Sequence, residues 1–449
     1  MKIGLKNRPV LRKLDDGLIL CRSIAQDAAA LADFNAMLHS DQGPEKPDER
    51  VGAWTRDLLA RPHPTFHPED FTLVVAADCG KIVSSMNLIS QTWSYEGIPF
   101  GVGRPELVGT LPEYRNRGLV RLQFNEVHAW SASRGELVQG ITGIPYYYRQ
   151  FGYEMGLDLG GGRVGYEPNL PAIPKGEREP VSFRRAAVED IPFLMTVAGH
   201  AARRFLIAST FDERMWRYVL TGQNKKNVNR REFRIIERAG TKEPVGYIAH
   251  PWFDWGNGLV INEYELKPGV SWLEVTPSVA RYLWKTGGRM MARVKKPRTV
   301  FAFWLGTEHP AYDVLRDALP RLRQPYAWYV RVADLPSFLS HVAPVLERRL
   351  AESLAVGYSG ELKLSFYRSG LQLTFEKGHL TGIEGWQPDA GNRGMAAFPD
   401  LTFLRLLFGQ SSIDELKSTF ADCWWDNDTT RLLLTILFPK KPSSFFGIA

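Results

Sequence analysis

The chain of 449 residues is poor in cysteine, with only Cys21, Cys79 and Cys423. These three lie far apart in the sequence, so they match neither the spacing of a disulfide framework nor the paired spacing of a structural metal site. We therefore expect no disulfide scaffold and no bound metal. A reducing cytoplasm is the simplest location for such a chain.

The chain also lacks long apolar segments. No stretch approaches the roughly 20 consecutive apolar residues that span a membrane. Residues 1–16 are basic but contain no apolar core of signal-peptide length. The sequence therefore predicts no membrane partner and no export.

Neither sign of charge is strongly in excess. The chain carries 56 Lys and Arg against 49 Asp and Glu, a formal net charge of +7. The basic residues are scattered, and their densest groups, near 224–226 and 230–231, are short. The sequence thus gives no support for a nucleic-acid partner. A modest positive excess would equally suit a phosphorylated cofactor.

The composition itself is ordinary for a globular protein, and the length exceeds what one hydrophobic core usually supports. Three glycines at 160–162 lead into a Pro- and charge-rich stretch, which we interpret as a linker over 166–180. Residues 334–336 interrupt a strand-like run and open an amphipathic helix. These breaks predict three domains: 1–165, 181–332 and 335–449.

The first predicted domain alternates strands and helices. A strand over 17–22 precedes a helix over 27–38, and residues 71–77 and 81–93 predict a hairpin. A strand over 106–110 then leads through a basic turn into a helix over 118–133. Apolar spacing places Val120, Phe124, Val127 and Trp130 on one face of that helix, and a buried strand over 137–141 follows.

The second predicted domain opens like the first. Residues 183–190 parallel 20–27, since each is a strand with an Arg five residues before an Asp at a helix start. From this we infer a duplicated fold. The segment 259–266 takes the place of the strand before the loop, but Lys267-Pro268-Gly269 follows it in place of a basic glycine loop. We therefore interpret this copy as a scaffold without a cofactor.

The third predicted domain contains a hairpin followed by helices. Apolar side chains alternate over 362–366 and again over 371–375, on either side of a turn with glycine. The chain ends in an apolar segment over 445–449. Because adjacent exposed Phe side chains favour association, we expect this segment to dock on the protein.

The loop from Arg115 to Val120 offers the chemistry of an anion site. Backbone N–H groups at a helix start are unpaired, and the helix dipole adds partial positive charge there. Gly118 allows close approach of an anion, and Arg115 and Arg117 would add charge-assisted hydrogen bonds. The alternative is a basic turn that caps a surface helix, because Arg-x-x-Gly alone is a short pattern.

The wider stretch from Val108 to Leu119 resembles the acetyl-CoA motif of the Gcn5-related N-acetyltransferases (GNAT). The resemblance implies an α/β fold with a mixed central sheet flanked by helices, and acetyl-CoA as acetyl donor without a metal. Val120 stands where the family has Gly or Ala. The implied cofactor-binding residues are Val108, Gly109, Thr110, Arg115, Asn116, Arg117, Gly118, Leu119 and Val120.

A second match to this family lies in Tyr148-Arg149-Gln150-Phe151-Gly152-Tyr153. The resemblance assigns Tyr148 as the general acid that protonates the departing CoA thiolate. A phenol with a pKa of about 10 is protonated at neutral pH and suits this role. A shift of one residue in the match would promote Tyr147 instead.

The resemblance implies direct transfer, with backbone N–H groups near Val108 to Thr110 stabilising the oxyanion. Glu106 is a candidate base on the same strand face as Val108 and Thr110; the alternative is a surface charge. Cys79 is a poor nucleophile candidate, because it lies in a hairpin turn without a partnered His.

Over residues 15–449 the arrangement resembles the enhanced intracellular survival family, with tandem GNAT units and a C-terminal α+β domain like a sterol carrier protein. In that family the C-terminal carboxylate acts as a base, which implies a role for Ala449. The resemblance also implies a homo-oligomer, and an amine acceptor such as an aminoglycoside or a protein lysine. The alternative function is a non-catalytic acyl-CoA or lipid-binding protein or sensor.

Overall fold

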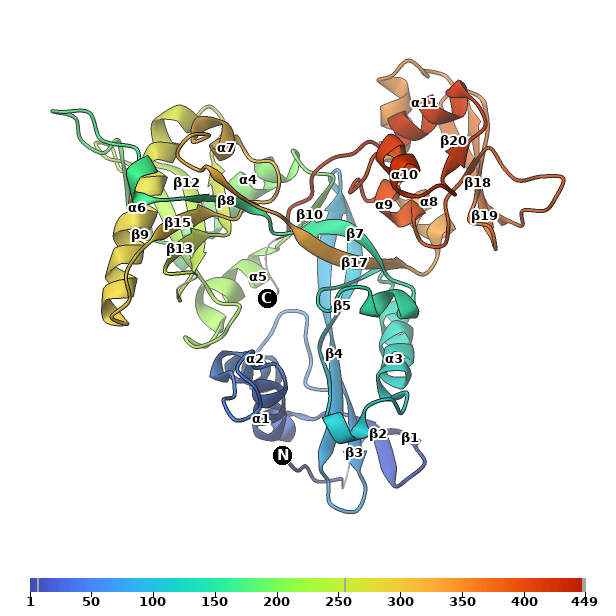
Figure 1. Cartoon of the computed structure of the whole chain (residues 1–449), viewed down its shortest axis with the longest axis horizontal. Helices are drawn as coiled ribbons and strands as arrows, with labels where there is room; N and C mark the ends of the chain where they lie inside the picture. Colours follow the sequence, from blue (N-terminus) through green and yellow to red (C-terminus); the bar gives the residue numbers. More distant parts are fainter. Residues whose placement is uncertain (6–7, 254–255, 446–449) are drawn as a thin grey trace.

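The structure is a computed structural model that describes residues 1–5, 8–253 and 256–445. The chain forms three lobes (Figure 1). The first is built around the long hairpin of β4 (Ile82–Tyr95) and β5 (Ile98–Thr110), and the second and third lie to either side of its tip. No helix in the described part of the chain is long and apolar enough to cross a membrane.

A mixed sheet forms the core of the first lobe. Its strands run in the order β1-β2-β3-β4-β5-β6-β17-β7, and β10 (Ile207–Ser209) pairs with β4. Every residue of β3 is buried, because helices cover both faces of the sheet there. The other strands are β1 (Val10–Lys13), β2 (Leu18–Arg22), β3 (Phe71–Ala76), β6 (Val138–Ile141), β7 (Glu154–Leu159) and β17 (Tyr326–Val332).

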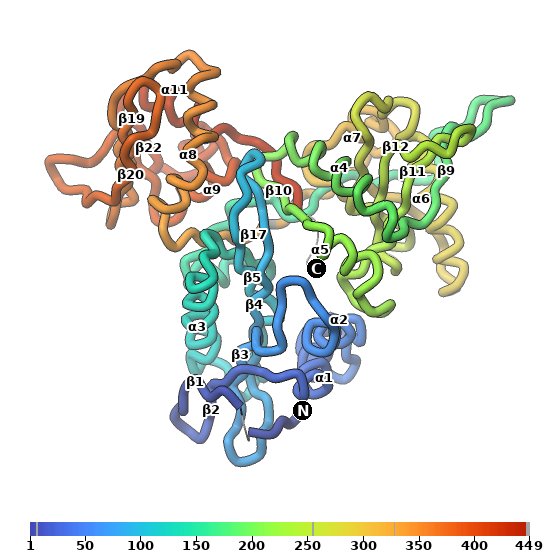
Figure 2. The backbone as a smooth tube through the Cα atoms, turned by 180° about the vertical axis from the view of Figure 1, so that it is seen from behind, coloured from blue at the N-terminus to red at the C-terminus, as the bar shows by residue number. Residues whose placement is uncertain are grey.

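Helices α1 (Ala28–Leu38) and α2 (Glu49–Ala60) cover one face of this sheet, and α3 (Leu119–Ser133) covers the other (Figures 1 and 2). The predicted apolar face of α3 is confirmed, since Phe124, Val127 and Trp130 are buried and Val120 is partly buried against the same cluster. The mixed α/β architecture predicted from the sequence is therefore present.

Strands β5 and β6 run parallel for a short distance and then part. They pair only at Val102 with Val138 and at Gly103 with Gln139. Further along β5, Leu107 has a positive φ of 52°, and the register against β4 shifts at this point. Such a bulge interrupts the alternation of side chains. The expectation that Glu106 shares one strand face with Val108 and Thr110 is therefore wrong.

The second lobe contains two four-stranded sheets, in the orders β14-β12-β11-β9 and β13-β15-β8-β16. The segment 259–266, predicted as one strand, is two strands in different sheets that part at Asn262. The elements are β8 (Gly162–Gly165), β9 (Val181–Arg185), α4 (Ile191–Ala202), α5 (Glu213–Arg217), β11 (Arg231–Arg238), β12 (Pro244–Pro251), β13 (Gly258–Ile261), β14 (Glu263–Leu266), α6 (Trp272–Arg293), β15 (Val300–Phe303), α7 (Pro310–Val314) and β16 (Arg321–Arg323).

The first two lobes exchange strands. β17 enters the first sheet between β6 and β7, and β8 enters the second lobe between β15 and β16. Gly162 makes the close approach at β8 feasible: its φ is 148°, and a Cβ would stand 2.1 Å from the carbonyl oxygen of Phe303. The two lobes are thus connected by shared sheets as well as by the chain.

The third lobe has a five-stranded sheet in the order β20-β19-β18-β21-β22. The predicted hairpin is present, with Leu364 opposite Leu371 and Leu362 opposite Leu373. The elements are α8 (Leu335–Ala351), β18 (Gly360–Ser365), β19 (Gly370–Glu376), β20 (His379–Trp386), β21 (Ala396–Ala397), α9 (Phe403–Leu407), α10 (Ile413–Thr419), β22 (Trp424–Trp425) and α11 (Asp428–Leu437).

The chain returns from the third lobe to the junction of the three lobes. Leu206 N–H donates to the carbonyl of Pro442 at 2.8 Å, and Ser209 N–H donates to that of Ser444 at 3.1 Å. The ring of Phe445 lies 4.4 Å from that of Trp93. The expected docking is therefore observed through Phe445. Residues 446–449, and with them Ala449, lie outside the described residues.

Candidate active site

A cleft opens beside β5 beyond the point where β5 and β6 part. Its volume is about 610 Å³, which lies in the range of small-molecule and cofactor sites. All nine predicted cofactor-binding residues line it, and so does Tyr148. The lining residues are Leu38, His39, Val108, Gly109, Thr110, Tyr114, Arg115, Asn116, Arg117, Gly118, Leu119, Val120, Arg121, Ile144, Tyr147, Tyr148, Gln150 and Phe151.

The loop before α3 is shaped by two residues in the left-handed region. Asn116 has a φ of 60° and Gly118 a φ of 72°. Gly118 is the N-cap of α3, and no side chain caps this helix start. A Cβ at Gly118 would meet nothing within 4 Å, so the glycine is required by its backbone conformation. The first N–H groups of a helix of 15 residues are thus left for a ligand.

Three arginines surround this helix start. Arg115 Nε donates to the carbonyl of Thr110 at 3.3 Å, which holds the loop against the end of β5. Arg117 pairs with the exposed Asp16 at 2.7 Å, a contact that solvent weakens. Arg121 donates to the carbonyl of Gln150 at 3.2 Å. Sequence reasoning missed Arg121, although its place three residues after Gly118 puts it in the first turn of α3.

Tyr148 lies in the short 3-10 helix Tyr147–Phe151, on the wall of the cleft opposite the loop. It is 6% exposed, and its ring packs against Phe124 of α3 and against Tyr329 of β17. Burial raises the pKa of Tyr148, and the nearby charge of Glu106 raises it further. The phenol therefore remains a proton donor throughout the neutral range.

Glu106 does not line the cleft. It is 7% exposed and forms an ion pair with Arg104, whose guanidinium lies over the ring of Trp328. The alternative of a surface charge is therefore wrong. Burial raises the pKa of Glu106, whereas the positive charge of Arg104 acts in the opposite direction. Arg104 itself donates to the carbonyl of Gly140, so its side chain fills the gap between β5 and β6.

His39 is a residue of the cleft that sequence reasoning missed. It is the C-cap of α1, beside Leu38 and Gly109. Among the described residues its Nε2 has no hydrogen-bond partner. Burial lowers the pKa of His39, and the carbonyl of Leu107 partly opposes this shift. The imidazole ring is therefore neutral at neutral pH. In the sequence, the only signal for His39 was its position at the end of a predicted helix.

Two other side chains that could take part in catalysis, Cys79 and His128, do not line the cleft. Cys79 is exposed in the turn between β3 and β4. His128 on α3 lies 2.8 Å from the hydroxyl of Tyr153, which fits a packing role. Within the described residues, no group of three His, Cys, Asp or Glu side chains could hold a metal ion.

Comparison with known proteins adds to this geometry. The family model described as "Acetyltransferase (GNAT) domain" matches residues 31–156, which include the loop, α3 and Tyr148. A Gcn5-related N-acetyltransferase from Kribbella flavida has a similar structure, with a TM-score of 0.64 at 18% identity over 96% of this chain and 98% of that one. The fold is that of the GNAT acetyltransferases. No curated protein matches the sequence.

Two further solved structures also match over nearly the whole length of this chain. A conserved protein of unknown function from Enterococcus faecalis has a TM-score of 0.67 at 14% identity, over 96% of this chain and 100% of that one. Eis1 from Mycobacterium abscessus has a TM-score of 0.55 at 11% identity, over 97% of this chain and 98% of that one. The similarity therefore extends beyond the GNAT domain to all three lobes.

Proposed function

We propose that this protein transfers an acetyl group from acetyl-CoA directly to a primary amine. One observation carries the proposal: the uncapped start of α3 and the buried phenol of Tyr148 line the same cleft. An anion site and a proton donor are the two groups that such a transfer requires. The acceptor class is an amine of a small molecule, such as an aminoglycoside, or of a protein lysine.

The cleft fits an acyl-CoA. The N–H groups at the start of α3 would hold its diphosphate, with Arg121 and Arg115 close to the same helix start. The backbone of Val108 to Thr110, which follows the bulge, lies in the cleft as a source of oxyanion donors. The cofactor supplies a thioester carbonyl that an amine can attack, and Tyr148 would protonate the departing sulfur.

His39 is our proposal for the base that receives the amine proton, directly or through one water. It lines the cleft, its ring is neutral, and its Nε2 has no hydrogen-bond partner among the described residues. Glu106 is not among the residues that line the cleft, and its carboxylate is paired with the guanidinium of Arg104. The geometry therefore favours His39 over Glu106.

The remaining parts of the proposal concern the other lobes. The second lobe repeats the element order of the first, so we propose tandem GNAT units. The start of α6 is capped by Ser271 and followed by the acidic Glu274, which disfavours a phosphate there. The third lobe would be the domain like a sterol carrier protein. By resemblance to the enhanced intracellular survival family, we also propose that the protein is a homo-oligomer located in the cytoplasm.

Titration calorimetry with acetyl-CoA tests the central claim. We expect one site per chain, because α3 has an open N-terminus whereas Ser271 caps α6. A stoichiometry of two would refute the scaffold interpretation of the second lobe. No heat at high micromolar cofactor would remove the acetyltransferase proposal altogether.

A lipid-binding protein is the second candidate function. A cleft of about 670 Å³ in the third lobe favours it, since Phe366, Leu401 and Phe403 contribute apolar walls. Native mass spectrometry of freshly purified protein separates the two candidates. A retained lipid together with no acetyl-CoA binding would support the carrier, whereas acetyl-CoA binding and thiol release with an amine would support the transferase.

Substitution of His39 with Gln tests the proposed base. We expect kcat/KM for the amine at pH 7 to fall roughly 10²-fold, because a neutral imidazole that accepts the proton is lost. Burial lowers the pKa of His39. In the pH profile of kcat/KM for the wild type, the midpoint of the acidic limb should therefore lie below the ordinary histidine pKa of about 6.5. His379→Gln, an exposed histidine of the third lobe, is the matched control and should retain activity. Unchanged kcat/KM in His39→Gln would exclude His39 as the base.

A further inference from the structure

A second cavity, apart from the transfer cleft, lies where the second lobe meets the end of β7, β17 and residues 443–445. Its volume is about 210 Å³, room for roughly seven water-sized groups at about 30 Å³ each. α4, β14, the segment 304–306 and Trp328 of β17 contribute to its walls. It shares no described lining residue with the cleft around Tyr148. Near this cavity the chain leaves one sheet of the second lobe at the end of β13 and enters the other at β14, with Asn262 between them.

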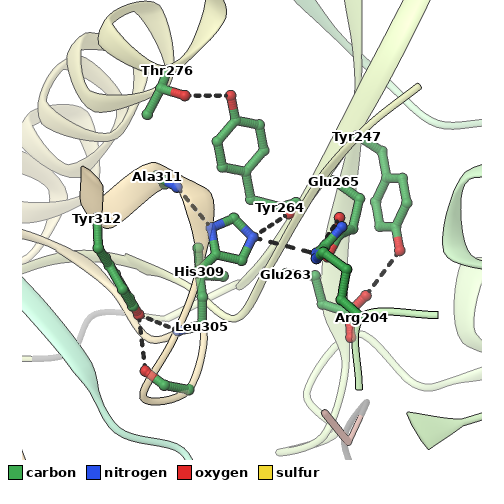
Figure 3. Close-up of polar contacts among 11 residues, drawn as sticks. Arg204, Tyr247, Glu263, Tyr264, Glu265, Thr276, Leu305, His309, Ala311 and Tyr312 are labelled. Carbon is green, nitrogen blue, oxygen red and sulfur yellow. Dashed lines mark hydrogen bonds and ion pairs between the residues drawn. The ribbon is translucent and has the colours of Figure 1, made fainter. Parts of the chain in front are cut away.

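Two glutamates of β14, Glu263 and Glu265, line this cavity and differ in their hydrogen-bond partners (Figure 3). Glu265 forms an ion pair with Arg204, whose Nη2 lies 2.7 and 2.8 Å from the two carboxylate oxygens. Glu263 accepts one hydrogen bond, from the hydroxyl of Tyr247 at 3.1 Å. Among the described residues its other oxygen, Oε1, has no partner. Among the described residues no ion pair joins Glu263 to a cation, although the charge of Arg231 acts on it from further away.

The histidine beside these carboxylates supplies no positive charge. His309 Nδ1 accepts from the N–H of Ala311 at 3.1 Å, and its Nε2 lies 2.9 Å from the carbonyl of Tyr264 (Figure 3). A ring that accepts at one nitrogen and donates at the other is neutral. Asp158 adds another carboxyl group, and no Lys or Arg is among the described lining residues.

Two further polar groups line the cavity without a partner in the described part of the chain. They are Oδ1 of Asn262 and the indole N–H of Trp328, a residue that is only 3% exposed. Buried polar atoms are almost always hydrogen-bonded, so each of these points to a missing partner. Several aromatic side chains also line the cavity, among them Phe205, Tyr247 and Trp328. Aromatic faces attract organic cations.

We propose that this cavity binds a small organic ammonium ion that also carries a hydroxyl group. The ammonium would pair with Glu263 and reach the amide oxygen of Asn262. The hydroxyl would accept from the indole of Trp328. This site goes beyond the proposed acetyl transfer, because it requires neither the loop before α3 nor Tyr148.

The titration of Glu263 gives the site a characteristic pH dependence. The pKa of Glu263 is raised to about 8, chiefly by burial and also by the charge of Glu265, against the opposing effects of Tyr247 and Arg231. A cation binds the ionised form, so affinity increases as pH rises through this value. An aliphatic amine with a pKa near about 10.4 stays charged meanwhile. Arg204 and His309 also lie beside β14, and Asp158 lines the same cavity.

Calorimetry with 5-aminopentan-1-ol as the probe tests this proposal on the full chain. We expect binding with one site per chain, at least about tenfold tighter than that of the neutral 1,5-pentanediol, because only the amine pairs with Glu263. Affinity should rise roughly 20-fold between pH 6.5 and 8.5, in step with the ionised fraction of Glu263. Equal affinity for the two probes, or no binding of the amine, would overturn the proposal.

Hydrogen exchange and two variants locate the binding site. The amine should protect amides of 258–266 and leave those of 106–120 unchanged; protection only at 106–120 would assign the probe to the transfer cleft and overturn the proposal. Glu263→Gln should lose at least about tenfold in affinity, because the amide carries no charge. Glu274→Gln, an exposed glutamate of the same lobe, is the control and should bind normally. If Glu263→Gln misfolds, Ala202→Leu narrows the cavity instead and should weaken binding.

Discussion

Substitution of Tyr148 with Phe is expected to lower kcat roughly 10²-fold or more, while the affinity for acetyl-CoA changes by less than about twofold. The phenylalanine ring keeps the packing against Phe124 and Tyr329, so the cleft should keep its shape. Only the proton for the departing thiolate is lost. Steady-state kinetics with a thiol-release readout, combined with calorimetry on the same protein, separates the two quantities.

Tyr147→Phe is the matched control, because Tyr147 neighbours Tyr148 in the same 3-10 helix and also lines the cleft. We expect it to retain most of the activity. If Tyr147→Phe showed the large loss and Tyr148→Phe did not, the acid would be Tyr147. Equal losses of turnover and cofactor affinity in Tyr148→Phe would argue against a role in proton transfer.

The second large effect concerns the buried ion pair of Arg104 and Glu106. Glu106→Gln leaves the guanidinium of Arg104 without a counter-charge at 1% side-chain exposure. Loss of one partner of a buried pair typically costs about 3–5 kcal/mol. For a lobe of roughly 150 residues, such as the first, a loss of this size should lower the melting temperature by on the order of 10 °C. Scanning calorimetry measures this change.

Two comparisons make the stability result specific. Glu113→Gln removes an exposed partner of Lys81 in the same lobe and should leave the melting temperature unchanged. The double variant Arg104→Met with Glu106→Leu removes both charges and should recover much of the loss, because apolar pairs can replace buried ions. A small shift in Glu106→Gln would show that Arg104 is compensated by Gln91 and the carbonyl of Gly140.

The sequence by itself determined the local parts of the cleft. The loop before α3, the start of that helix at Gly118 and the segment from Tyr148 each depend on residues close together in the chain. Their backbone conformations follow from short-range preferences, such as the positive φ that Gly118 adopts without strain. For the same reason the mixed α/β class and the apolar face of α3 could be predicted.

Only the tertiary structure decided the parts that involve distant strands. The bulge at Leu107 turns Glu106 away from the cleft and into its pair with Arg104, which alternation along one strand cannot reveal. β17 brings Tyr329 against Tyr148 and places Trp328 against the guanidinium of Arg104, although it lies far along the chain from both partners. Trp328 also lines the second cavity. Strand pairing over such separations depends on the packing of whole sheets, so no local pattern specifies it.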